Sequence, residues 1–228
     1  MTHKLRTFSQ ALAAALALGA VAASAASAFP EFTGDSFATI TGTQISGLIT
    51  SKETNKPEFT TRAGTVKCNK VSLDGSMTFS ESPEQTLTPT YSECTLAGVV
   101  PLDIATNSCD FLITTVNTVG ESPNRITAGL DIKCSSLGDK IVMTATGPNC
   151  VITIPPQSSP ITGMELHNKG GAGSTMDVEA TIDLFGLTHE IHGNACPNSP
   201  FPTTLYSDGF YRGLWTLQSN GVHGFTIH

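Results

Sequence analysis

The stretch Val178-Glu179-Ala180-Thr181-Ile182-Asp183-Leu184 carries an apolar side chain at every second position, with charged or hydroxylic side chains between them. Such alternation is typical of a β-strand that buries one face. After Phe185-Gly186 the alternation resumes in Leu187-Thr188-His189-Glu190-Ile191-His192. We therefore predict two strands that form a β-hairpin with its turn at Phe185-Gly186.

The chain on either side has the same character. Short runs rich in Thr, Val and Ile are broken by Gly, Pro, Asn and Ser at intervals of about ten residues, and no stretch after residue 28 has a helical period. This rhythm predicts an all-β fold, an antiparallel β-sandwich of the jelly-roll or immunoglobulin-like type, as a single domain over residues 29–228. Asn220-Gly221 predicts a further hairpin near the C-terminus.

Residues 1–28 have the features of a secretory signal peptide. Lys4 and Arg6 precede an apolar stretch rich in Ala and Leu, and small residues end at Ala28, where we expect cleavage. A cut after Ala25 would change little. An uncleaved membrane anchor is the less favoured alternative, because alanine is only weakly apolar. We therefore predict a secreted, extracellular protein with no integral membrane segment after cleavage.

The charge of the chain disfavours polyanionic partners. The full chain has a formal charge of −7, and removal of the leader takes away two basic residues and no acid, which gives −9. Nucleic acids and anionic lipids are bound through clustered Lys and Arg. We therefore expect no nucleic-acid partner.

Six cysteines, all after the leader, predict three disulfides that staple the fold. Sequence alone allows 15 pairings for six cysteines. Strand direction favours one of them, because Cys109 opens an expected strand and Cys134 closes the next, so antiparallel pairing brings them to the same end. The same logic joins Cys68 to Cys94 and Cys150 to Cys196. Thiolate binding of a metal is disfavoured, since there is no Cys-x-x-Cys.

A weak internal similarity relates residues 94–113 to residues 134–154. Each block has a strand, a tight turn, a cysteine and a second strand. We interpret this as a possible meander duplication within the domain. Chance similarity between short strands of like composition is the alternative.

No catalytic or metal-binding motif is evident, and we predict no catalytic residue, no metal and no cofactor. His189 and His192 are spaced i, i+3 on an expected strand, so their rings point to opposite faces, unlike the two ligands of a helical zinc motif. We interpret His189 as packed and His192 as solvated. Five acids could supply a carboxylate pair for glycoside hydrolysis, but no pair stands out: Asp103, Asp110, Asp131, Asp177 and Asp183.

The most distinctive side chains are aromatic and lie between residues 206 and 215. On a strand, Tyr211, Gly213, Trp215 and Leu217 share one face, and Phe210, Arg212, Leu214 and Thr216 share the other. If exposed, they would form a ligand-binding platform for sugar rings or peptide, made by Tyr206, Tyr211, Arg212 and Trp215. If buried, Tyr211 and Trp215 are core, which we favour because the single Trp of a sandwich is usually buried.

The mature chain resembles a family of uncharacterised secreted six-cysteine β-rich proteins of soil actinobacteria, which has no assigned activity. The similar segments are Ile40-Thr41-Gly42-Thr43-Gln44, Phe59-Thr60, Thr88-Pro89-Thr90-Tyr91-Ser92-Glu93-Cys94, the Asn-x-Cys turn at Cys109, residues 150–157 and Gly173-Ser174-Thr175. They span most of residues 36–218. The resemblance implies secretion and a β-rich fold and adds no function. The Pro-rich residues 196–202 depart from the family, which has shorter glycine-rich loops there.

Our leading hypothesis is a non-catalytic structural or binding protein of the cell exterior, whose partner is a cell-wall polymer, a matrix component or another protein. The alternative is a secreted polymer hydrolase whose carboxylates are assembled by the fold. A third, less favoured possibility is a pore-forming or surface-lattice subunit.

Overall fold

The computed structural model describes residues 30–34, 38–44, 56–119, 122–157, 161–169, 177–196, 205–220 and 224–228. The expected signal peptide lies outside these residues. All regular elements in the described part are strands: β1 Phe32–Gly34, β2 Thr39–Gln44, β3 Glu58–Thr61, β4 Gly64–Ser76, β5 Glu81–Ser82, β6 Glu84–Leu96, β7 Val100–Ala105, β8 Cys109–Val119, β9 Ser122–Cys134, β10 Ile141–Ala145, β11 Val151–Ile154, β12 Ile161–Lys169, β13 Asp177–His192, β14 Leu205–Ser219 and β15 Phe225–Ile227. The prediction of an all-β fold is confirmed.

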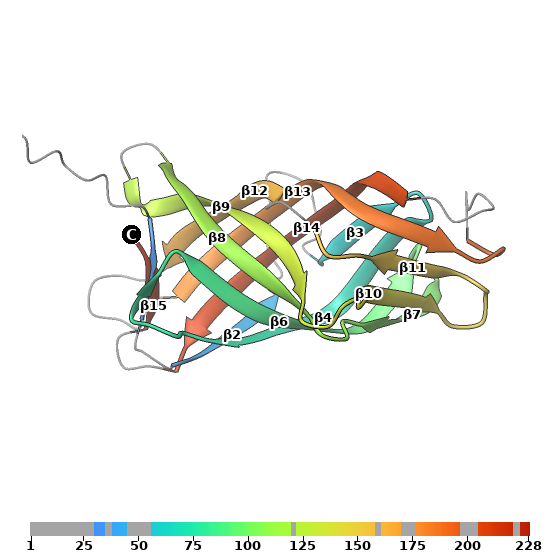
Figure 1. The fold of residues 1–228 in the computed structure, drawn as a ribbon, viewed down its shortest axis with the longest axis horizontal. Helices are drawn as coiled ribbons and strands as arrows, with labels where there is room; N and C mark the ends of the chain where they lie inside the picture. Colours follow the sequence, from blue (N-terminus) through green and yellow to red (C-terminus); the bar gives the residue numbers. More distant parts are fainter. Residues whose placement is uncertain are drawn as a thin grey trace, which may run out of the picture.

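Twelve of these strands form one antiparallel sheet that closes into a barrel (Figure 1). At one end the closed ring is β6-β8-β9-β12-β13-β14-β2-β4, eight strands that meet through the pairing of β4 with β6. Toward the other end β7, β10, β11 and β3 replace β8, β9, β12 and β2 in the ring. The long strands β4, β6, β13 and β14 run through both rings and hold them in one body.

The predicted β-sandwich is therefore not the observed architecture. A sandwich consists of two sheets with free edges, whereas here the pairing of β4 with β6 joins the ends of a single sheet. Alternating strands bury one face in either architecture, so the sequence pattern does not distinguish them.

The predicted hairpin at residues 178–192 is also wrong, because these residues form the single strand β13. Phe185 and Gly186 form a β-bulge at which the register with β14 shifts, and Gly186 takes a φ of 87°. Because of the bulge, the alternate residues from Val178 to Leu184 and those from Leu187 to Ile191 point to the same inward face. As a result β13 is long enough to pair with β12 at one end and β11 at the other.

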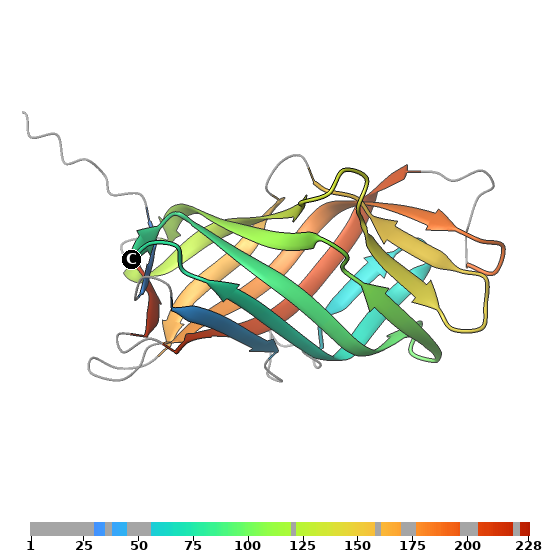
Figure 2. The same ribbon diagram turned by 60° about the horizontal axis from the view of Figure 1, so that its bottom comes forward.

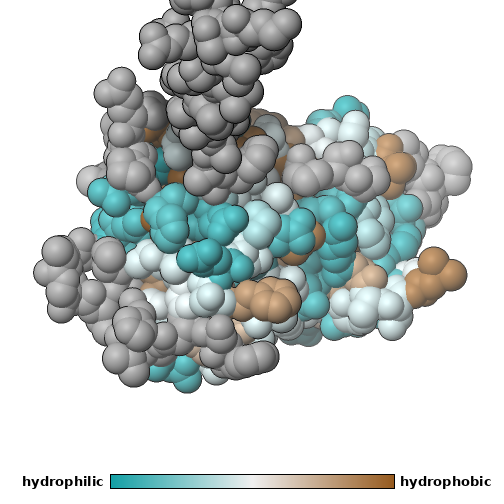
Figure 3. All heavy atoms as spheres, turned by 60° about the vertical axis from the view of Figure 1, so that its left-hand side comes forward, coloured by the Kyte–Doolittle hydropathy of each residue, from teal (hydrophilic) through white to brown (hydrophobic). Residues whose placement is uncertain are grey.

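A small sheet of β15, β1 and β5, which we call the end sheet, covers one end of the barrel, on the left in Figure 1. Phe32 and Phe225 stack there with ring centroids 5.4 Å apart, and both are fully buried. The predicted C-terminal hairpin is not formed, because β15 pairs with β1 and not with β14. Figure 3 looks toward this end of the molecule, where most of the coloured surface is hydrophilic or neutral.

All three predicted disulfides are present and join Cys68 to Cys94, Cys109 to Cys134 and Cys150 to Cys196. The first two link directly opposed residues of neighbouring strands. Three disulfides in one chain are typical of extracellular proteins. Within the described residues, no helix is long and apolar enough to cross a membrane.

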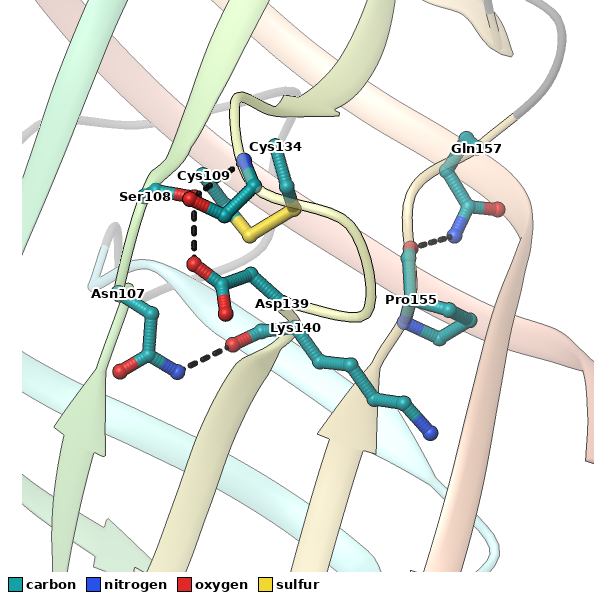
Figure 4. Close-up of a disulfide and its surroundings, with 9 residues drawn as sticks. Asn107, Ser108, Cys109, Cys134, Asp139, Lys140, Pro155 and Gln157 are labelled. Atoms are coloured by element: carbon teal, nitrogen blue, oxygen red, sulfur yellow. Dashed lines mark hydrogen bonds between the residues drawn. A yellow bond between two sulfur atoms is a disulfide. The ribbon is translucent and has the colours of Figure 1, made fainter.

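The Cys109–Cys134 disulfide marks the place where one ring passes into the other (Figure 4). The Ser108 hydroxyl donates to Asp139 Oδ2 at 2.6 Å, and the Asn107 amide donates to the Lys140 carbonyl at 2.6 Å. These bonds attach the start of β8 to the segment that leads into β10.

Gln157 lies beside β13 in the gap between its pairing with β12 and its pairing with β11. Its Oε1 accepts the backbone N–H of Thr188 at 3.1 Å, and its Nε2 donates to the Pro155 carbonyl at 2.7 Å. The same Nε2 lies 3.4 Å from the Thr188 carbonyl. The side-chain amide thus takes the place of a neighbouring strand where β13 leaves β12 and has not yet reached β11.

Candidate functional site

The aromatic residues of β14 divide between the two faces of the barrel wall. Tyr211 and Trp215 point inward and are 7% and 0% exposed, whereas Phe210 and Arg212 lie on the outer face. Tyr206 is half-buried, near the other end of the strand. The structure therefore places Tyr211 and Trp215 where no external ring could stack on them, and the four predicted ligand-binding residues do not form one exposed platform.

Inside the barrel, a cavity of about 30 Å³ lies where the two rings meet. Its lining is apolar apart from two tyrosines: Pro57, Phe59, Val66, Cys68, Tyr91, Ile104, Phe111, Leu130, Ile132, Ile141, Met143, Ile154, Leu184, Leu187 and Tyr211. One water needs about 10–15 Å³ of such space. The cavity therefore has room for about two waters, or for a molecule of a few heavy atoms. Anything larger requires the lining to repack, for which the flexible side chain of Met143 is suited.

Polar groups converge at one side of this cavity. A Cβ on Gly213 would lie 3.5 Å from Trp215 Nε1 and 3.8 Å from the Tyr211 hydroxyl, so the absence of a side chain at Gly213 leaves space beside both groups. Both atoms are buried. Neither meets the full geometry of a hydrogen bond, but the Tyr211 hydroxyl is close enough to Tyr91 and Trp215 for hydrogen bonding to both to counteract part of the rise in its pKa. A buried donor without a partner costs about 1–3 kcal/mol. The site therefore offers two weakly bonded donors: the hydroxyl of Tyr211, which lines the cavity, and Trp215 Nε1, which lies beside Tyr211 and outside the lining.

Tyr91 brings a third polar group to the same place. Burial raises the pKa of Tyr91 well above its usual value, and the neighbouring Tyr211 adds to the rise. Burial also raises the pKa of Tyr211. Both phenols therefore remain protonated and able to donate at any physiological pH. Trp215 is held in place by Phe111, whose ring stacks on it at 5.8 Å.

Tyr91 was not among the predicted site residues. The signal for it is the alternation of Thr86, Thr88 and Thr90, which points these threonines outward and Tyr91 inward on β6.

A column of stacked side chains leads from the cavity toward the surface. Phe59, which lines the cavity, meets the His189 ring edge-on at 6.0 Å, and His189 stacks on Tyr206 at 5.4 Å. The Arg62 guanidinium lies 4.8 Å from the Tyr206 ring centre and pairs with Asp208 at 2.8 Å. The column closes this side of the cavity with aromatic faces.

His189 is fully buried in this column, as the alternation predicted. Its Nδ1 lies 3.3 Å from the Leu187 carbonyl, and its Nε2 has no partner. Burial lowers the pKa of His189 below its usual value. His192 lies on the outer face, 3.4 Å from Glu190. The two histidines do not share a site.

Among the described residues, each of the five acids considered for hydrolysis has partners other than the remaining four, or none. Asp183 pairs with Arg212 at 3.1 Å, Asp177 accepts from Gln218 and Asp110 accepts from Thr88. Asp131 is buried beside Lys133, and Asp103 is exposed. Within the same residues, no group of three or more His, Cys, Asp or Glu side chains could hold a metal.

No family model matches the chain, and comparison with curated proteins and with solved structures found no match either. The resemblance to the actinobacterial family stays a prediction.

Proposed function

We propose that this chain is a secreted, non-catalytic binding protein of the cell exterior, and that its barrel holds a small, mainly apolar molecule. The observation that carries the proposal is an apolar cavity lined by two neighbouring tyrosines, Tyr91 and Tyr211, with Trp215 beside Tyr211. A largely apolar pocket with a few convergent polar groups is the usual form of a small-molecule site. An eight-stranded barrel is wide enough to hold one small ligand.

The three polar groups point to a ligand with a hydrogen-bond acceptor, such as a carbonyl. A ligand of about four heavy atoms gains at most about 6 kcal/mol, which corresponds to a Kd no lower than about 40 μM. Tighter binding would require a larger ligand and repacking around Met143.

Trp215 provides the readout, because it is the only tryptophan of the chain. We expect acetone to shift the single indole N–H resonance in a saturable way, since its oxygen would accept from the Tyr211 hydroxyl, which lies beside Trp215. Isobutene has the same shape and no oxygen, and should bind more weakly. Tyr211→Phe should weaken acetone binding, whereas Tyr206→Phe, outside the cavity lining, should not. If neither compound gives a saturable shift, the proposal is wrong.

The alternative of a polymer hydrolase gains no support from the site. A glycosidase needs a carboxyl group with a raised pKa to act as the acid. The described carboxyl groups with displaced pKa values are Glu93, Glu190 and Asp208, and all three are lowered by hydrogen bonds to Lys70, Lys140 and Arg62 respectively.

A further inference from the structure

The outer face of β2, β4 and β6 differs from the rest of the barrel wall. Where β2 lies beside β4, eight outward positions carry seven hydroxyl side chains and one acid, all of them exposed: Thr39 and Thr41 on β2, Ser72, Asp74 and Ser76 on β4, and Thr86, Thr88 and Thr90 on β6. We call these eight residues the hydroxyl face. Beyond this area β4 and β6 also carry the exposed ion pair of Lys70 with Glu93. Figure 2 turns this side of the barrel toward the viewer.

The hydroxyl face is regular, because the three strands are in register. Thr41 is opposite Asp74, and Asp74 is opposite Thr88. On either side of this row, Thr39 is opposite Ser76 and Ser72 is opposite Thr90. Neighbouring strands lie about 4.8 Å apart, and alternate residues on a strand lie about 6.8 Å apart. The side chains therefore form a grid of similar groups at repeated intervals.

The backbone beneath the grid is held firmly. Ile40, Leu73 and Leu87 point inward from the same three strands and are fully buried or nearly so. A Cβ at Gly42 would approach Leu73 Cβ to 2.9 Å, so β2 and β4 pack closely. A surface already ordered loses little conformational entropy when it binds.

Most of the hydroxyl groups are free to interact with a partner. Of these seven hydroxyls, only that of Thr88 makes a hydrogen bond to another described residue, donating to Asp110 at 2.6 Å. Outside these eight residues, opposite charges neutralise each other on the outer face, including Lys70 and Glu93 farther along β4 and β6. Asp183 pairs with Arg212 at 3.1 Å, and Glu58 pairs with Lys67 at 3.2 Å.

We propose that the hydroxyl face is a second binding site, which lies along a neutral polysaccharide of the cell exterior. Thr and Ser hydroxyls both donate and accept hydrogen bonds, which suits them to sugar hydroxyls. The only charge in the grid is the acid Asp74, and the whole chain carries −7, so a polyanionic polymer is repelled. Single hydroxyl contacts are weak, but a polymer engages several at once and gains by avidity. This second site is independent of the cavity inside the barrel.

The test is co-sedimentation of the mature protein with insoluble cellulose, chitin and β-1,3-glucan, with polygalacturonate as the anionic comparison. The grid variant is Thr41→Val, Thr86→Val and Thr90→Val combined, which keeps side-chain shape and strand preference. The matched control variant makes the same change at Thr144, Thr162 and Thr181, on β10, β12 and β13. None of the six hydroxyls makes a hydrogen bond among the described residues.

We expect the wild type to bind at least one neutral polymer. The grid variant should bind that polymer at least about tenfold more weakly, because three hydroxyls are lost. The control variant should bind it within about twofold of the wild type. Equal retention by the grid variant would overturn the proposal, as would binding to polygalacturonate alone or to no polymer. Binding to ice crystals without binding to any polysaccharide would also overturn it. Near-ultraviolet circular dichroism of all three proteins verifies that each is folded.

Discussion

Replacing Gln157 by alanine tests how the barrel wall is held together between its two rings. Gln157 is buried, and its side-chain amide serves both backbone groups of Thr188. Alanine would leave the Thr188 N–H without its acceptor and the Pro155 carbonyl without its donor. No strand is paired with Thr188 on this side of β13 to replace them, because β14 lies on the other side.

The loss of stability expected for Gln157→Ala follows from these hydrogen bonds. A buried N–H that loses its partner costs about 1–3 kcal/mol. Thr188 is half-buried, so water recovers part of that loss. With the bond to Pro155 included, we expect Gln157→Ala to lower the free energy of unfolding by about 2–3 kcal/mol, and Tm by about 4–12 °C for a chain of this size.

Urea denaturation followed by Trp215 fluorescence measures the change, and hydrogen exchange at the Thr188 amide locates it. Gln218→Ala is the matched control, because Gln218 is exposed and donates only to Asp177 at 2.9 Å. That variant should stay within about 0.5 kcal/mol of the wild type. A loss below about 0.5 kcal/mol for Gln157→Ala, with unchanged exchange at Thr188, would refute the role assigned to Gln157.

Gln157→Glu adds a pH dependence of known sign. One carboxylate oxygen would face the carbonyl oxygens of Pro155 and Thr188, so the folded state would favour the neutral acid and raise its pKa above the unfolded value of about 4.3. The variant should therefore be most stable below about pH 4.3 relative to wild type, and lose stability as the pH rises through the folded-state pKa.

Three further predictions concern the disulfides, the buried histidine and the glycines. Removing the Cys109–Cys134 disulfide by a double change to serine should cost about 3.5 kcal/mol, from a loop whose cysteines are 25 residues apart, as measured by urea denaturation without reductant. Burial lowers the pKa of His189, so its contribution to stability is present above about pH 6.5 and is lost as the pH falls toward the pKa of His189 in the folded state. In a plot of unfolding free energy against pH, His189→Gln should lack this loss. Gly163→Ala, whose Cβ would lie 2.2 Å from a β13 carbonyl oxygen, should lower Tm far more than Gly98→Ala, which has nothing within 4 Å and costs about 1 kcal/mol for its left-handed backbone.

The cysteine pairing could be predicted because it depends only on neighbouring strands. Cys68 opposes Cys94, and Cys109 opposes Cys134, in simple antiparallel pairs. Once each strand's ends were placed in the sequence, direction alone brought the right thiols together. The two faces of β14 were predicted by the same local rule of alternation.

Closure of the barrel could not be predicted in this way, since it depends on which distant strands pair. The bulge at Phe185 and Gly186 shows the difficulty on a smaller scale. A glycine with positive φ fits both a hairpin turn and a bulge. The partner decides between them, because β14 continues past the bulge as one uninterrupted strand.

The cavity could not be predicted from the sequence for a related reason. Tyr91 and Tyr211 are far apart in the sequence and lie on β6 and β14, which are not adjacent in the sheet. Alternation points each of them inward, but only the curvature of the closed wall brings their hydroxyls to the same side of the lumen.

The pairing of β1 with β15 has a mechanical consequence. Phe32 is opposite Ile227 and Gly34 is opposite Phe225, so the two ends of the described chain leave the pair side by side. Tension applied between the termini would break the hydrogen bonds between β1 and β15 one pair after another, by unzipping, and would not load them all at once in shear. The end sheet should therefore yield at low force, while the barrel behind it, crosslinked by its disulfides, resists extension.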